Sequence, residues 1–281
     1  MGVVDGKVAF ITGAGRGQGR SHALKLAEEG ADIIALDVAD ESAVGTIPYK
    51  LSTSADLDET ARLVEEKGRR CVKCIADVRD LEQVQRVVDE GLSELGRIDI
   101  VCANAGIGGW GVSWEMSATQ WQDMIDINLT GVWNAARAAL PSMVDRGEGG
   151  CLVLTSSTAG LIGYANTAHY TAAKHGVIGL MKVMSAELGP HRIRVNAICP
   201  TTVNTPLVIN DATFELFAPD KENPGPDDVS DAFTGLNSLP IPWIEPSDVS
   251  EAVAWLCSDA ARFVHGIALP VDGGNTAKKG S

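Results

Sequence analysis

The sequence predicts an α/β fold, a doubly wound parallel sheet (Rossmann-like) with helices on both faces. Short apolar runs, typical of buried strands, alternate with helix-like segments along most of the chain. A glycine-rich turn follows the first run, and polar side chains follow several later ones, as at the ligand-binding edge of such sheets. The 281 residues suffice for one sizeable core and no linker divides them, so we expect a single domain over residues 1–274.

Composition and charge narrow the classes of function. Hydrophobic residues make up 45% of the chain and charged residues 21%, which is ordinary for a globular protein. The net charge of −14 disfavours nucleic acid or an anionic membrane as a partner. No apolar run approaches the ~20 residues of a membrane span. Because the first residues lack the cationic and apolar parts of a signal peptide, we expect a cytoplasmic protein.

The six cysteines predict no metal or redox site. Four of them lie in apolar stretches, where cysteine usually behaves as a small core residue. Cys71 and Cys74 match the Cys-x-x-Cys pattern, but the run around them alternates as a strand does and no second pair follows. We therefore expect no bound metal.

The first apolar run, residues 8–11, leads into a glycine-rich turn and then into a helix that extends to about Glu29. This order is the phosphate-binding geometry of dinucleotide-binding proteins, because glycines let the backbone approach a pyrophosphate and the helix N-terminus offers free N–H groups. The spacing departs from the literal G-x-G-x-x-G, and a tight turn alone is the alternative. The predicted cofactor-binding residues here are Gly13, Arg16, Gly17, Gln18 and Gly19.

The second apolar run, residues 32–36, ends in Asp37. An acidic residue in this place can accept hydrogen bonds from the adenosine ribose and repel a 2′-phosphate, which predicts NAD as the cofactor. Arg16 instead favours a cofactor with a 2′-phosphate, because its side chain could reach that group. We weigh Asp37 more heavily.

Residues 38–55 form an inserted loop of mostly small residues that includes Gly45, Pro48 and Tyr49. A compact α/β domain usually crosses this gap in a handful of residues. The loop is either a surface excursion or a flap over the adenosine end of the cofactor.

The alternation of strands and helices continues to the last apolar run. We expect strands at residues 71–76, 98–102, 150–155, 193–198 and 267–271, and helices from about residue 56, at 80–95, at 117–140, through Tyr170 to Leu188, and at 247–258. Polar or small residues follow two of these strands at the carboxyl edge of the sheet, where ligands bind in open α/β folds. They add Asp77, Val78, Asn104, Ala105 and Gly106 to the predicted cofactor site.

Tyr170 and Lys174 are four residues apart in a helix-like segment, so their side chains share one face. A free tyrosine has a pKa of ~10 and is a poor acid or base near neutral pH. An ammonium about 4–5 Å away would favour the phenolate and lower that pKa by roughly two to three units. Ser157, just after a predicted strand, would hold a substrate oxygen beside the phenol. For the pair alone, an ordinary solvated helix face is the alternative.

Residues 200–246 contain eight of the twelve prolines together with several aromatic residues. We expect little regular structure there and a substrate lid over an apolar pocket, with a dimer-contact loop as the alternative. Trp110, Trp114 and Tyr164, near the predicted site, favour an apolar substrate. The tail, residues 275–281, is expected to be flexible.

With these residues in place, the chain resembles the short-chain dehydrogenase/reductase family over nearly its whole length. The matching residues are Thr12, Gly13, Gly17, Gly19, Asp77, Asn104, Ala105, Gly106, Asn128, Ser157, Tyr170, Lys174, Pro200, Val203 and Thr205. Within that family it looks most similar to the mycofactocin-associated group, which includes carveol dehydrogenase-like enzymes. Residues 17–22, 129–133, 173–176 and 269–272 carry this similarity, as does the long gap after Asp37. Thr201 is a departure, since glycine commonly follows the proline at this place in the family.

The resemblance implies catalytic roles for four positions. Tyr170 is the general acid and base, and Lys174 lowers its pKa and binds the nicotinamide ribose. Ser157 positions the substrate oxygen. Asn128, which the helix pattern alone would leave as a solvent-facing residue or a cap, holds a water that links Lys174 to solvent.

The resemblance also implies how the cofactor is held and renewed. Pro200, Val203 and Thr205 seat the nicotinamide carboxamide. In the mycofactocin-associated group the inserted segment shields the cofactor, so that bound NAD does not exchange and an external redox carrier re-oxidises it. Relatives of this kind indicate a homotetramer.

The leading functional hypothesis is an NAD-dependent oxidoreductase that interconverts a secondary alcohol and its ketone. The substrate would be apolar, of the cyclic or terpenoid kind. One alternative is a non-catalytic NAD-binding sensor, which could dispense with Tyr170 and Lys174. Another is an acyl-carrier ketoreductase, which would need a basic patch that a net charge of −14 does not suggest.

Overall fold

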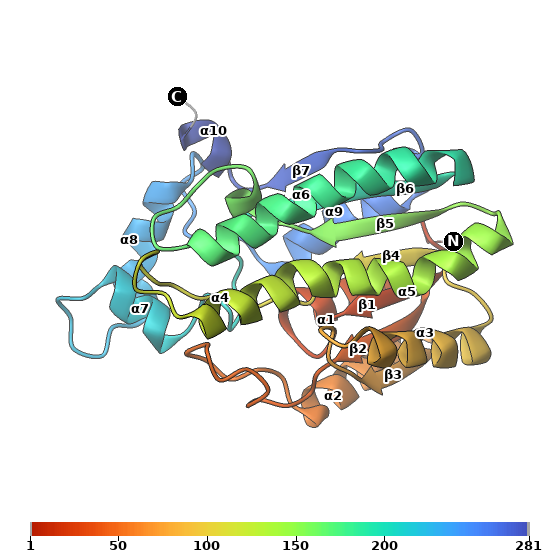
Figure 1. Ribbon diagram of the computed structural model, residues 1–281, viewed down its shortest axis with the longest axis horizontal. Helices are drawn as coiled ribbons and strands as arrows, with labels where there is room; N and C mark the ends of the chain where they lie inside the picture. The colour runs from red at the N-terminus through yellow and green to blue at the C-terminus, as the bar shows by residue number, and fades with distance from the viewer. Residues whose placement is uncertain (1, 280–281) are drawn as a thin grey trace.

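The computed structural model describes residues 2–279 and confirms the predicted fold class (Figure 1). Seven parallel strands form one sheet in the order β3-β2-β1-β4-β5-β6-β7. The strands are β1 (Val8–Thr12), β2 (Asp32–Asp37), β3 (Cys71–Ile75), β4 (Ile100–Ala103), β5 (Gly150–Thr155), β6 (Ile193–Pro200) and β7 (Ala268–Val271). The strand order reverses between β1 and β4, and open α/β sheets bind their ligands at such a switch point.

Helices cover both faces of the sheet. They are α1 (Gly17–Glu28), α2 (Ser54–Glu66), α3 (Leu81–Leu95), α4 (Ala118–Ile125), α5 (Gly131–Arg146), α6 (Ala168–Leu188), α7 (Asp211–Phe217), α8 (Pro226–Leu236), α9 (Pro246–Cys257) and α10 (Asn275–Lys279). Strand residues alternate between two cores: Phe10 packs with residues of α3, α5 and α6, whereas Ile11 packs with residues of α1, α2 and α9. Within residues 2–279, no helix is long and apolar enough to cross a membrane.

The single helix predicted over residues 117–140 is wrong in two respects. A π-helical segment, Asp126–Thr130, separates α4 from α5, and α5 continues through Pro141 to Arg146. The π segment carries Asn128, which is fully buried rather than solvent-facing because its amide pairs with the backbone of Ile107. One-turn π insertions occur often at functional sites, where they redirect a side chain.

The expectation of little regular structure in residues 200–246 is also wrong. The segment contains α7 and α8, which lie beyond the carboxyl edge of the sheet (Figure 1) and share a small core of Phe214, Val229 and Phe233. Proline does not prevent these helices, because Pro226 occupies the first helical turn, where its missing N–H is not needed. At the other helix, the Asn210 side chain accepts a hydrogen bond from the Thr213 N–H and caps α7.

The expected flexible tail is wrong for residues 275–279, which form α10. Asn275 is almost fully buried, and Lys278 donates hydrogen bonds to the carbonyls of Gly235 and Asn237 at the end of α8. The last two residues of the predicted tail lie outside the described residues. The helix forms because α8 supplies partners that are distant in sequence.

Asp99, which precedes β4, connects several segments at the amino edge of the sheet, opposite the carboxyl edge. Its buried carboxylate accepts the Val8 N–H at 2.9 Å and pairs with Arg97 at 2.6 Å and Arg146 at 3.1 Å. Glu148 pairs with the same two arginines, but its side chain is 57% exposed. The two carboxylates therefore differ mainly in burial.

We expect Asp99→Ala to lower the free energy of unfolding by about 3 kcal/mol, because a buried N–H loses its acceptor and two arginines keep only their exposed partner, Glu148. The matched change Glu148→Ala should cost less than about 1 kcal/mol, since exposed ion pairs contribute little. Denaturant unfolding of both variants measures the difference. Equal losses of unfolding free energy in the two variants would contradict the conclusion that the buried carboxylate contributes more than the exposed one.

Candidate functional site

The glycine turn after β1 brings three backbone segments into close contact. Gly13 has a φ of +70°, and a Cβ there would lie 2.8 Å from the Cα of Ala105. A Cβ on Gly19 would lie 2.0 Å from the Gly13 carbonyl oxygen, so no larger residue fits. Gly17 also has a positive φ and faces Thr205. The turn is thus a cradle that only glycines allow.

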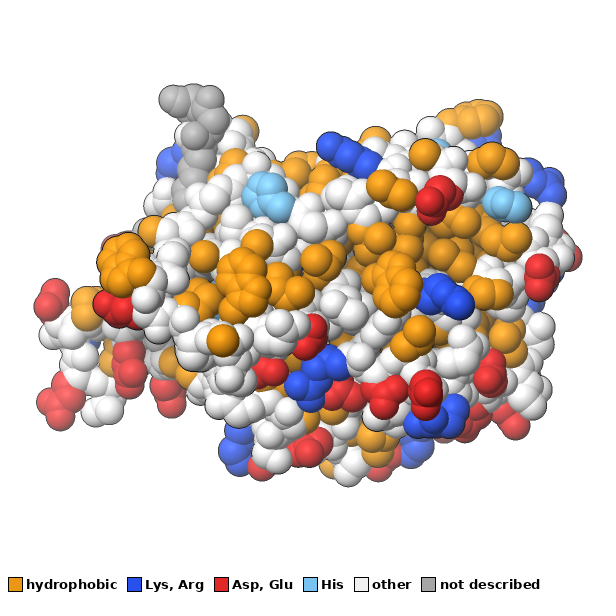
Figure 2. Space-filling view, viewed as in Figure 1, with side chains coloured by type: hydrophobic (Ala, Val, Ile, Leu, Met, Phe, Trp, Pro, Cys, Tyr) orange, Lys and Arg blue, Asp and Glu red, His pale blue; other side chains and the backbone are white. Residues whose placement is uncertain are grey.

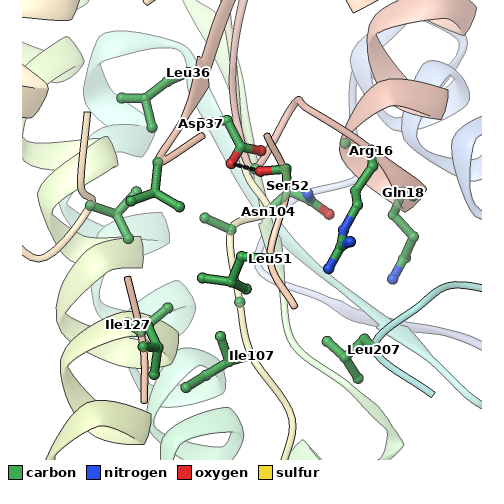
Figure 3. A pocket seen from close by; sticks show the side chains of 18 of the residues that line it. Arg16, Gln18, Leu36, Asp37, Leu51, Ser52, Asn104, Ile107, Ile127 and Leu207 are labelled. Carbon is green, nitrogen blue, oxygen red and sulfur yellow. Dashed lines mark hydrogen bonds between the residues drawn. The ribbon is translucent and has the colours of Figure 1, made fainter. Parts of the chain in front are cut away.

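A cavity of about 140 Å³ extends from this turn along the carboxyl edge of the sheet. Its lining includes most of the predicted cofactor-binding residues: Gly13, Arg16, Gly17, Gln18, Gly19, Asp37, Asp77, Val78, Asn104, Ala105, Gly106 and Thr205. Figure 3 shows Arg16 and Gln18 on one side of it and Ile127 and Ile107 on another. The Oε1 atom of Gln18 is buried and has no hydrogen-bond partner among the described residues. A buried polar atom without a partner suggests that a ligand completes the site.

Asp37 ends β2 at this cavity, and both of its carboxylate oxygens have partners. Oδ2 accepts the Gly15 N–H at 2.7 Å, and the Ser52 hydroxyl donates to Oδ1 (Figure 3). The Arg16 guanidinium donates to the carbonyl of Lys50. Asp37 and Arg16 therefore join the glycine turn to the inserted loop.

The inserted loop lies against the cavity, so it is not a free surface excursion. Val44, Tyr49, Leu51 and Ser52 form part of the cavity wall. Burial raises the pKa of Tyr49 to about 12.

Contacts with three other elements fasten the loop in this position. The Tyr49 hydroxyl accepts the N–H of Gly108 at 2.8 Å. Thr46 donates to Asp123 of α4 at 2.6 Å, and Arg79 donates to the Ala43 carbonyl at 3.3 Å.

Asp77 and Asn104 follow β3 and β4 at the same edge. The Asp77 carboxylate pairs with Arg79 at 2.6 Å, so a direct role toward the cofactor stays a prediction. The Asn104 side chain donates to the Thr12 carbonyl at 3.1 Å, and its N–H donates to the Thr12 hydroxyl. These bonds fix the turn after β4 beside the glycine turn.

The four predicted catalytic residues come from three elements and converge. Ser157 follows β5, Tyr170 and Lys174 lie on α6, and Asn128 lies on the π segment. The Ser157 hydroxyl lies close enough to the Tyr170 phenol to lower its pKa. A Cβ on Gly106 would lie 2.8 Å from Asn128 Oδ1 and 3.5 Å from Lys174 Nζ, so both of these side chains border Gly106.

Lys174 is buried, and its Nζ donates to the Thr155 carbonyl at 2.9 Å. The Ser156 hydroxyl donates in return to the Lys174 carbonyl at 2.9 Å. These two bonds hold α6 against the end of β5. Burial lowers the pKa of Lys174 to about 8.

The pKa of Tyr170 is set mainly by burial, and its lowering by Lys174 stays a prediction. Burial raises the pKa of Tyr170 above its ordinary value, and the hydrogen bond with Ser157 opposes this effect without cancelling it. The ammonium lies over the phenol ring, 5.6 Å from its centroid, and is directed to the Thr155 carbonyl. Burial is therefore the largest influence on the pKa of Tyr170.

A second cavity, of about 390 Å³, opens on the lid side of Tyr170. Its apolar walls include Trp110, Leu207, Val208, Leu216, Phe217, Phe233 and Leu236, and its polar wall includes Ser157, Thr158, Tyr164, Thr167, Tyr170, Thr201 and Asn275. Trp114 is not part of this lining and its side chain is 84% exposed, which corrects its expected place near the pocket.

A third cavity, of about 80 Å³, joins the other two. Its lining combines Gln18, Asn104, Gly106, Ser157, Tyr170, Lys174, Pro200, Val203 and Thr205. The predicted carboxamide-binding residues thus lie beside the predicted catalytic ones. No group of three or more His, Cys, Asp or Glu side chains within the described residues could hold a metal ion.

Sequence reasoning missed three residues of the site. Ser52 on Asp37, Leu207 between two cavities and Asn275 in the polar wall become visible only through contacts between distant segments. Tyr49, the one aromatic residue in a stretch of small ones, was the available signal for the inserted loop.

The fold, glycine cradle and convergent side chains define an α/β protein with a dinucleotide-type cleft, and comparison with known proteins identifies its family. The sequence model of the short chain dehydrogenase family matches residues 7–215. The chain belongs to this family. It is 53% identical over 279 residues to (−)-trans-carveol dehydrogenase of Rhodococcus erythropolis, covering 99% of this chain and 100% of that one.

Two solved structures are also close. Carveol dehydrogenase from Mycobacterium avium in complex with NAD has a TM-score of 0.97 and 53% identity, with 99% of this chain and 100% of that chain covered. A short chain dehydrogenase from Mycobacterium paratuberculosis bound to NAD has a TM-score of 0.89 and 41% identity, with 98% and 100% covered. The resemblance to this family and to carveol dehydrogenase-like enzymes is confirmed, whereas the association with mycofactocin stays a prediction.

We expect Gly19→Ala to abolish retention of NAD, because the new Cβ would lie 2.0 Å from the Gly13 carbonyl and displace the cradle. Gly45→Ala is the matched control, since a Cβ there meets nothing within 4 Å. The measurement is the NAD content of each purified variant after addition of NAD, with the melting temperature recorded beside it. Normal NAD content in Gly19→Ala would contradict the cradle.

Proposed function

We propose that this protein is an NAD-dependent dehydrogenase that interconverts a secondary alcohol and its ketone, with Tyr170 as general acid and base. One observation carries the proposal. Ser157 and Tyr170 both line the 390 Å³ apolar pocket and the small cavity that also borders Gln18 and Asn104 beside the glycine cradle. A substrate oxygen in the pocket would meet both hydroxyls beside the cofactor cleft.

The residues of the cleft fit NAD. The glycine cradle would receive the pyrophosphate, Gln18 Oε1 lacks a partner within residues 2–279, and Asp37 lies where a ribose would bind. Arg16 is already bonded to the Lys50 carbonyl, which supports NAD over a cofactor with a 2′-phosphate. Pro200, Val203 and Thr205 would seat the carboxamide. NAD, when bound, supplies the ring that accepts or returns a hydride.

The protein's own residues hold the oxygen and move its proton. Ser157 donates a hydrogen bond to the substrate oxygen, and Tyr170 takes the hydroxyl proton during oxidation or gives it during reduction. Lys174, whose pKa of about 8 lets it gain or lose a proton near neutral pH, binds the nicotinamide ribose beside Tyr170. Asn128 retains capacity for a water, since its amide oxygen accepts one bond, from Ile107.

The substrate in this proposal is an apolar alcohol of the cyclic or terpenoid kind, such as carveol. Aromatic and branched side chains from the lid helices form most of the pocket wall, and Trp110 contacts Phe217 edge-on at 6.1 Å. Such walls bind a rigid ring by burial of apolar surface.

The cofactor in this proposal stays bound, and an external carrier such as mycofactocin re-oxidises it. The inserted loop supports this part, because five residues outside it hold it against the cleft: Asp37, Arg16, Arg79, Asp123 and Gly108. Release of NAD would require most of these bonds to open together.

The protein in this proposal is a cytoplasmic homo-oligomer, a tetramer by analogy with its relatives. Apolar side chains gather over α5 and α6 on the face shown in Figure 2. Trp133 of α5 and Val183 of α6 are exposed. A Cβ on Gly179 of α6 would meet nothing within 4 Å, which leaves room for another helix. All six cysteines are free thiols, as is usual in a reducing compartment.

We expect Tyr170→Phe to reduce kcat by about 10³-fold, because it removes the group that exchanges the proton. The substrate is whichever alcohol the wild type oxidises best in a panel of secondary alcohols that includes carveol. The variant should keep its NAD and its melting temperature, because the phenylalanine ring keeps the packing of the Tyr170 ring against the core. Turnover close to that of the wild type would refute the assignment.

We expect NAD to stay with the protein through dialysis, to be released on denaturation and to exchange slowly with labelled NAD. Tyr49→Phe should accelerate exchange about fivefold, since the Gly108 N–H loses its acceptor. Ser42→Ala is the matched control in the same loop, because Ser42 bonds only to the exposed Asp40. Loss of the cofactor on simple dialysis would count against a shielded site.

A further inference from the structure

The C-terminal helix α10 is fastened to the end of lid helix α8. Asn275 Nδ2 donates to the Leu236 carbonyl at 3.1 Å and approaches Asn237 Oδ1 at 3.4 Å. Lys278 Nζ donates to the Gly235 and Asn237 carbonyls at 2.7 and 2.9 Å. Asn275 is 1% exposed, so its bonds to α8 are shielded from water.

The same asparagine faces the substrate pocket. Its Oδ1 accepts the hydroxyl of Tyr164, which also bonds to the Thr158 hydroxyl at 3.0 Å. Asn275, Tyr164 and Thr158 all line the 390 Å³ cavity, and Thr158 directly follows Ser157. A continuous chain of bonds therefore runs from the lid, through Asn275, to the segment that carries a predicted catalytic hydroxyl.

Each link in this chain uses a different atom of the amide. The donors serve α8 and the acceptor serves Tyr164, so Asn275 joins two walls of the pocket. A second bond between the walls runs from the Thr201 hydroxyl to Asn237 Oδ1 at 3.1 Å, but it does not involve Tyr164. Buried polar groups that lose a partner are costly, and they become disordered or recruit water. Loss of Asn275 would thus loosen both walls at once.

We propose that Asn275 is a substrate-positioning residue, which makes α10 part of the substrate site and fixes the polar wall of the pocket against the lid. The inference rests on the proposed function, since it assumes that the alcohol binds in this pocket. Asn275 acts through Tyr164 and α8 and exchanges no proton. It selects for alcohols large enough to touch the wall that it holds.

The test compares Asn275→Ala with Thr276→Ala, its neighbour on α10, which bonds to Asp272 and does not line the pocket. With carveol as the probe, Asn275→Ala should raise KM about tenfold and change kcat less than about threefold. The reason is that binding of the carveol ring must then order a pocket wall that the substitution has loosened. With 2-propanol, which is too small to span the pocket, KM should change less than about twofold. A parallel loss for both alcohols would overturn the proposal, since a general defect in folding acts on both.

Tyr164→Phe supplies an independent check. It removes the hydroxyl that Asn275 accepts while leaving α8 anchored. If the two residues act through one chain of bonds, the KM of the double variant should nearly equal the higher of the two single-variant KM values. Multiplicative effects of the two changes on KM would show independent roles and overturn the proposal.

A readout without turnover separates this inference from the proposed function. Hydrogen exchange of the amides in residues 226–236 should be accelerated about tenfold in Asn275→Ala and unchanged in Thr276→Ala. Unchanged exchange in both variants would overturn the inference even if Tyr170→Phe is inactive. An active Tyr170→Phe variant, in contrast, would overturn the proposed mechanism and leave the exchange result standing.

Discussion

The structure depends on the pair of bonds that holds α6 against the end of β5. Lys174 donates to the Thr155 carbonyl, and the Ser156 hydroxyl donates to the Lys174 carbonyl. Gly160 is required beside them, because a Cβ there would lie 2.1 Å from the Ser156 hydroxyl and 2.7 Å from the Lys174 carbonyl. This close approach sets Tyr170 near Ser157, where both residues line the 390 Å³ pocket and the 80 Å³ cavity.

The segments that enclose the site are held by a different kind of bond. Asp37 and Arg16 fix the inserted loop at one end of the cleft, and Asn275 fixes the lid at the other. In each place one polar side chain bridges segments that are far apart in sequence. The sheet edge supplies a rigid floor, and these bridges determine how open the cleft and the pocket are.

Local patterns predicted the sheet, and non-local contacts explain most of what they missed. The alternation of apolar runs located every strand to within two residues, because buried parallel strands are apolar on both faces. The glycine turn and the residues at the ends of β2, β3 and β4 line one cavity, as the strand order requires. The π segment was not predictable, since Asn128 is held by Ile107, a residue from another element. From the sequence alone, Asn275 likewise resembles a polar tail residue, because its partner on α8 is distant in sequence.

The pKa of Tyr170 likewise depends on contacts that the sequence does not show. Sequence spacing gives the separation of two charges along a helix, but it does not give their burial. Burial raises the pKa of Tyr170 and lowers that of Lys174 to about 8, so the lysine loses its proton before the phenol does. The protein's own residues therefore hold Tyr170 as the protonated phenol, the form that can donate a proton to a ketone oxygen. In the proposed oxidation of an alcohol, the phenol must first lose that proton, and the nearby Ser157 hydroxyl lowers the pKa of Tyr170 and so favours the phenolate.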